Sequence, residues 1–123
     1  MFYISTNLTH AASDGSTESY VTLPVAAKLN SVRLCPDVST AKHASNYVTF
    51  SIADNAATTI FSATTADSGG VTLTAGTPVT VTLSTAADYD FAAGETVKIR
   101  VADNSGGANC AFTVVYEFAP ARG

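Results

Sequence analysis

Hydrophobic and polar residues alternate along most of this chain with a period of two, which is typical of β-strands that bury one face. The clearest run is Pro78–Ser84, where Val79, Val81 and Leu83 share one side. Three further runs repeat the pattern, namely Tyr47–Ala53, Thr96–Asp103 and Ala111–Phe118. We expect all four to be strands. The last is the most apolar, so we expect it to lie centrally or against a partner chain.

Weaker strand patterns fill much of the remaining sequence, at Phe2–Ser5, Tyr20–Leu23, Ala27–Cys35 and Thr58–Thr64. Within the third of these, Leu29 is out of phase with Val32, which indicates a bulge near Asn30. Turn-forming residues separate the strands, and no segment has a helical period. About eight short strands within 123 residues predict a single all-β domain over residues 1–123, an antiparallel β-sandwich of the jelly-roll type. An immunoglobulin-like sandwich is the alternative fold.

Aromatic and aliphatic residues at two places are the candidate interface residues. Met1, Phe2, Tyr3 and Ile4 begin the chain, ahead of a polar segment. We expect residues 1–18 to form either an arm or edge strand that docks on another subunit, or a first strand that completes its own sheet. The second place is the pair of aromatic residues before the turn at Ala92-Ala93-Gly94, which either meet a partner or anchor a long loop on the core: Tyr89 and Phe91.

The charge of the chain excludes several partners. The formal net charge is −4, and the few Lys and Arg residues are scattered, so no nucleic-acid partner is expected. No apolar run reaches the roughly 18 residues of a membrane span, so no membrane partner is expected either. The N-terminus shows no Sec-type signal, and we expect synthesis and use without that export route.

Motifs that carry enzyme chemistry are missing from the sequence, which predicts that the protein is not an enzyme. His10 and His43 are expected at a surface or an interface. Asp and Asn residues in predicted loops could hold calcium, but turn formation explains them without a metal, and we expect neither metal nor cofactor. Cys35 and Cys110 are the only cysteines; we expect two reduced thiols, although the predicted strands could place them side by side.

Two segments of the chain resemble strands of small phage head proteins, Leu23–Arg33 and the hairpin Phe91–Val101. The whole pattern, rich in Ala, Thr and Val and beginning at Met1, resembles phage capsid decoration (cement) proteins of the jelly-roll type. The resemblance implies a structural virion protein, synthesised in the host cytoplasm and located on the outer surface of a bacteriophage head. It would act as a homotrimer that binds the major capsid protein and stabilises contacts between its copies. The alternatives are a phage tail or fibre component and a carbohydrate-binding adhesion module.

Overall fold

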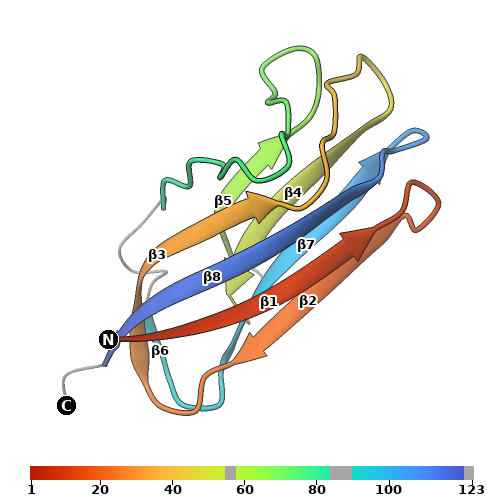
Figure 1. Cartoon of the computed structure of the whole chain (residues 1–123). Coiled ribbons are helices and arrows are strands. Elements are labelled where there is room, and N and C mark those ends of the chain that lie inside the picture. The colour runs from red at the N-terminus through yellow and green to blue at the C-terminus, as the bar shows by residue number, and fades with distance from the viewer. Residues whose placement is uncertain (55–57, 84–89, 121–123) are drawn as a thin grey trace.

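The computed structural model describes residues 1–54, 58–83 and 90–120 (Figure 1). None of these residues is helical. They form eight strands, in chain order β1 (Phe2–His10), β2 (Ser16–Thr22), β3 (Ala27–Pro36), β4 (Tyr47–Asp54), β5 (Thr59–Thr64), β6 (Asp90–Phe91), β7 (Thr96–Asn104) and β8 (Cys110–Pro120).

The strands form two four-stranded sheets, with the orders β1-β8-β3-β6 and β2-β7-β4-β5. Antiparallel partners include β1 with β8, β2 with β7, β3 with β6, and β4 with β5. The first strand thus pairs with the last, the second with the seventh, the third with the sixth, and the fourth with the fifth. This pattern results when one long hairpin of eight strands folds over into two layers. The fold is therefore a jelly-roll sandwich, as the strand pattern predicted.

Side chains from both sheets fill the space between the layers. Tyr116, Phe112 and Phe118 point inward from β8, and Phe50 and Ile52 point inward from β4; each of these five is fully buried. The rings of Phe50 and Phe112 meet across the two sheets with centroids 5.2 Å apart. Burial of a side chain of this size contributes about 2 kcal/mol, so this aromatic contact between layers is a main source of stability.

Most of the predicted strands are confirmed by the structure. Strands β4, β7 and β8 match the three alternating runs to within two residues at each end. Strand β8 is central, between β1 and β3. The expected bulge is present as a register shift between Leu29 and Ser31 in β3. The turn-rich segment after β3 crosses from one sheet to the other, as jelly-roll topology requires.

The strand predicted at Pro78–Ser84 is wrong for the part that the structure describes, residues 78–83. This segment makes a single isolated bridge, between Val79 and Leu34 of β3. Its two valines and Leu83 are half-buried against the core, while Thr80 and Thr82 are exposed. The alternation thus marks a segment packed along the edge of the sandwich, and it lacks the ladder of hydrogen bonds that defines a strand.

The first strand is longer than the predicted Phe2–Ser5, because β1 continues to His10. Its second half is polar in sequence, yet Leu8 and His10 are buried. Polar groups on this inner face find partners on β2: Thr6 Oγ1 and Ser19 Oγ are 2.5 Å apart, and His10 Nδ1 is 2.7 Å from Thr17 Oγ1. These bonds allow a polar segment to enter the interior. The expectation that His10 lies at a surface is therefore wrong.

Candidate functional site

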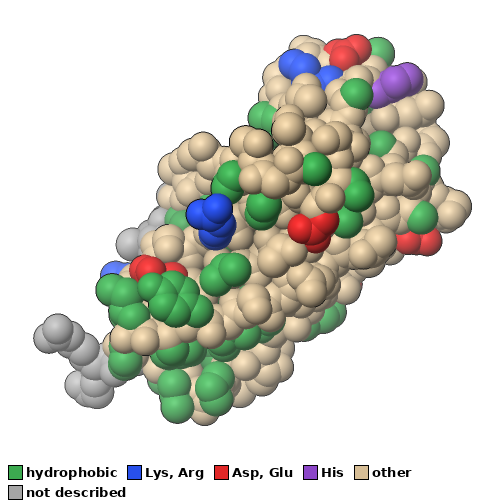
Figure 2. Space-filling view, in the orientation of Figure 1, with side chains coloured by type: hydrophobic (Ala, Val, Ile, Leu, Met, Phe, Trp, Pro, Cys, Tyr) green, Lys and Arg blue, Asp and Glu red, His purple; other side chains and the backbone are tan. Residues whose placement is uncertain are grey.

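One end of the sandwich exposes apolar residues and is the candidate functional site. The start of β1 and the end of β8 lie there, together with the β2–β3 and β6–β7 loops (Figure 1). The exposed fractions are 75% for Met1, 64% for Tyr3 and 51% for Val25. We call the following exposed residues the apolar end: Met1, Tyr3, Pro24, Val25, Ala92 and Pro120. Figure 2 shows hydrophobic side chains gathered near the start of the chain, on the face that it draws. A cluster of this kind is a frequent mark of a protein-binding surface.

Local sequence explains why these residues are exposed. Odd-numbered residues of β1 face outward, so Tyr3 lies on the outer surface of its sheet, while Phe2 and Ile4 pack against the core. The β2–β3 loop is tied to the β6–β7 loop by backbone bonds from Leu23 N to Glu95 O and from Gly94 N to Leu23 O. With Leu23 held in the core, the next two residues are left on the surface.

The predicted interface residues divide into two groups. Met1 and Tyr3 are exposed, as an interface residue must be. Phe2 stacks on Phe118 with ring centroids 5.3 Å apart, and Phe91 is only 4% exposed and meets the same ring edge-on at 6.2 Å. Phe91 thus takes the core-anchoring place that the sequence allowed as the alternative. Tyr89 lies outside the described residues.

An open hollow of about 680 Å³ adjoins the apolar end. Its charged lining residues are Lys28 and Asp90, which lie opposite each other on β3 and β6. The other lining residues are small or apolar: Ala27, Phe91, Ala92, Ala119 and Pro120. Such a lining can accept an apolar side chain of a partner and position it between two charges of opposite sign.

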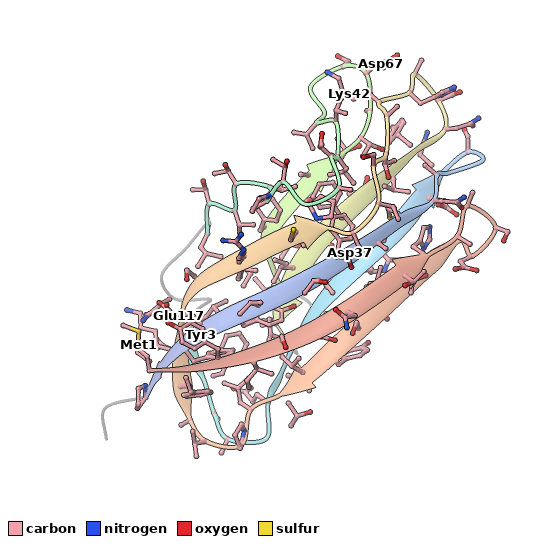
Figure 3. All side chains as sticks on the ribbon, viewed as in Figure 1. Met1, Tyr3, Asp37, Lys42, Asp67 and Glu117 are labelled. Carbon is pink, nitrogen blue, oxygen red and sulfur yellow. The ribbon has the colours of Figure 1, made fainter. Side chains whose placement is uncertain are left out.

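Tyr3 is held in place by its neighbour on β8. Its hydroxyl donates a hydrogen bond of 3.0 Å to Glu117 Oε2, and Figure 3 shows the two side chains together near Met1. This bond, together with the negative charge of Glu117, raises the pKa of the Tyr3 phenol. The phenol therefore remains a neutral donor, and its ring is presented to solvent in one orientation.

The opposite end of the sandwich is closed by hydrogen bonds that converge on Asp103. Its carboxylate accepts a bond of 2.7 Å at Oδ1 from His10 Nε2 and one of 3.0 Å at Oδ2 from the Gly15 amide. The backbone of Asp103 also bonds to Gly15, with its N–H 2.7 Å from the Gly15 carbonyl. One side chain thus joins β1, the β1–β2 turn and β7. We call these three residues, together with Thr17, the Asp103 cluster.

His10 has a partner at both ring nitrogens, in an environment where its side chain has no exposed surface. With Nε2–H donating to Asp103, the Nδ1 atom accepts from the Thr17 hydroxyl when the ring is neutral; when the ring is charged, the same hydroxyl accepts from Nδ1–H. The ring is fully enclosed, and its two bonds join β1 to β2 and to β7. The cluster therefore has the features of a structural lock, and sequence reasoning missed it because its members are up to 93 residues apart.

The two cysteines are free thiols in different environments. Cys110 is buried opposite His10, and Cys35 is half-buried opposite Thr113. Burial, reinforced by the charge of Asp103, raises the pKa of the Cys110 thiol to about 12. Within residues 1–54, 58–83 and 90–120, no three His, Cys, Asp or Glu side chains converge as a metal site would require.

No protein family, curated protein or solved structure matches the chain. The part of the chain that the structure describes also contains no helix long and apolar enough to span a bilayer.

Proposed function

We propose that this protein is a structural component of a phage virion, a capsid decoration protein that docks on the outer surface of the head through its apolar end. The observation that carries the proposal is the contrast between the two ends: Met1, Tyr3 and Val25 are more than half exposed, while the opposite end is occupied by internal hydrogen bonds. A β-sandwich that exposes apolar residues at one end suits a protein that binds a shell and stabilises it. Because its strands are already ordered, little conformational entropy is lost on docking.

The chemistry of the apolar end fits a protein partner. An aromatic ring and aliphatic side chains form the centre of many interfaces, with charged residues depleted there. Lys28 and Asp90 beside the hollow supply opposite charges at its margin, where they can set the orientation of a partner. In a homotrimer, as the resemblance implies, three linked copies would bind the shell together, so each contact can be modest. The trimer implied by the resemblance stays a prediction for the docked protein.

The proposal is tested by cosedimentation with expanded, undecorated heads of the phage whose genome encodes the chain. The double variant Tyr3→Ser/Val25→Ser removes the apolar contacts, and we expect it to lose binding at least tenfold. The matched control is Val38→Ser/Val71→Ser, which changes two valines that are 42% and 37% exposed elsewhere on the molecule. We expect this control to bind like the wild type.

Two results would contradict the proposal. Absence of binding by the wild-type protein to such heads removes the decoration role. Specific retention on a glycan array, with loss after Tyr3→Ser or Tyr20→Ser, would instead support a carbohydrate-binding module, because exposed tyrosines are then the sugar platforms. Tyr20 is 54% exposed on the outer face of the second sheet, and Lys98 Nζ lies 5.6 Å from its ring centroid.

A further inference from the structure

Strand β1 is the edge of its sheet along its whole length. Nine residues, Phe2–His10, pair with β8 in unbroken register. Figure 1 shows β1 along the border of the front sheet, with β8 on its inner side. In an antiparallel ladder, alternate residues direct their N–H and C=O groups to one neighbour and the rest to the other side. Half of the β1 backbone groups therefore point to an open edge.

In the described part of the chain, the other three sheet edges carry features that discourage pairing with a further strand. Strand β6 has two residues, one of them Asp90. Strand β5 is short, and its pairing with β4 shifts register between Ile52 and Ala53. Strand β2 carries Glu18, whose carboxylate is 2.7 Å from Lys98 Nζ and 3.7 Å from Arg100 Nε. Short length, bulges and charges are the usual protections of an edge.

Strand β1 has none of these protections. From Phe2 to Thr9 it contains no Pro, Gly or charged residue. Its outward side chains are Tyr3, Ser5, Asn7 and Thr9, all exposed. An edge strand without charge can pair with an identical strand, since no like charges are brought together by the two-fold symmetry. This property favours a second copy of the chain as the occupant.

We propose that two copies of the free protein associate through antiparallel pairing of their β1 strands, which joins the two β1-containing sheets into one continuous sheet. The register that pairs the whole strand is centred on Thr6. It sets Ser5 opposite Asn7 of the partner subunit, and on the inner face it sets Ile4 opposite Leu8 of the partner subunit. The first pair is polar and uncharged, and the second extends the apolar core across the new contact.

This pairing has a consequence for the apolar end. Antiparallel strands run in opposite directions, so the apolar ends of the two copies point away from each other. Both remain exposed in the pair, and one copy can dock while the other is directed outward. The inference therefore does not rest on the proposed function, and a failure of either leaves the other standing.

Light scattering of the purified full chain tests the inference. We expect a mass of twice 12.6 kDa for the wild type at micromolar concentration. Ser5→Lys/Asn7→Lys and Ser5→Asp/Asn7→Asp each place like charges at the new edge contact, and each is expected to weaken association at least tenfold. An equal mixture of the two variants is expected to recover the two-copy mass, because opposite charges then meet. Recovery also shows that both variants are folded.

The matched control places the same charges on the edge of the other sheet. Thr59 and Ser62 of β5 are both exposed, and Thr59→Lys/Ser62→Lys should keep the two-copy mass. A wild-type mass of one or three copies overturns the inference. So does a two-copy mass that survives the lysine variant of β1, since the contact would then lie elsewhere.

Discussion

The two ends of this sandwich are both built from strand ends and turns, but they differ in which side chains are bonded within the fold and which are exposed. At one end, the Asp103 carboxylate accepts hydrogen bonds from the buried His10 ring and from the Gly15 amide. At the other end, Met1 and Val25 remain exposed. At the first end, polar groups from β1, the β1–β2 turn and β7 are hydrogen-bonded to one another. At the apolar end, large apolar side chains remain exposed to solvent. This contrast underlies our proposal that the Asp103 cluster stabilises the fold and that the apolar end binds a partner.

The largest loss of stability is expected from removing the carboxylate at the centre of the Asp103 cluster. Asp103→Ala leaves the buried His10 ring and the Gly15 amide without their acceptor. An unsatisfied buried donor of this kind costs about 3 kcal/mol in the free energy of unfolding. Urea denaturation measures it. Asp37→Ala is the control, because the Asp37 side chain is exposed and bonds only to Thr113 among the described contacts. Equal losses for both variants would contradict a stabilising role for the Asp103 cluster.

A pair of glycines compares the two ends directly. Gly107 and Gly94 both have positive φ, at 65° and 86°, so alanine strains the backbone at either position by about 1 kcal/mol. At Gly107 an added Cβ would also meet Asp103 Oδ1 at 2.0 Å, whereas at Gly94 it meets nothing within 4 Å. We expect Gly107→Ala to lower the unfolding free energy at least twice as much as Gly94→Ala. Equal thermal unfolding shifts would show that the Asp103 carboxylate is not fixed there.

Alkaline pH should lower the stability of the fold through Cys110, which pairs with His10 of the Asp103 cluster. Burial raises the pKa of this thiol from 9.0 to about 12, so above pH 9 the unfolded chain releases a proton that the native protein retains. Stability is then fully present below pH 9 and is lost as the pH rises toward 12, by about 1.4 kcal/mol per pH unit. Burial also raises the pKa of Tyr116, from 10.0, so its contribution begins later.

The measurement is the unfolding free energy at pH 8 and at pH 10, for the wild type and for Cys110→Ala. We expect most of the wild-type loss over this range to disappear in the variant. A variant with the same loss would show that other groups cause the pH dependence. For each protein, the unfolding free energy at pH 10 is compared with the value for the same protein at pH 8.

The smallest effect on stability is expected at the apolar end. Tyr3→Ser/Val25→Ser removes two exposed side chains and one exposed hydrogen bond, and the change in unfolding free energy should stay within about 0.5 kcal/mol. Val38→Ser/Val71→Ser should behave alike in the same urea titration. A loss of 2 kcal/mol or more in the first variant would mean that the apolar end supports the fold, which would remove the distinction between the ends.

Residue alternation was sufficient to predict the sandwich, because buried strands of a two-layer fold impose a period of two on the sequence. It also located the bulge at Leu29, where the period fails. The polar half of β1 could not be predicted in this way, since burial of His10 depends on Thr17 and Asp103, which come from two other strands. The apolar end was predicted in part, through Met1 and Tyr3. Val25 lies near Met1 and Tyr3 only in the folded sandwich, so its place at the apolar end could not be predicted from the residue pattern.

The central claim concerns which end of the protein meets its partner, and a cryo-electron microscopy map of decorated heads tests it most directly. We expect the apolar end, with Met1, Tyr3 and Val25, to contact the shell, and the turns around the Asp103 cluster to point to solvent. A map with the Asp103 cluster against the shell, or with an outer sheet face as the contact, would contradict it.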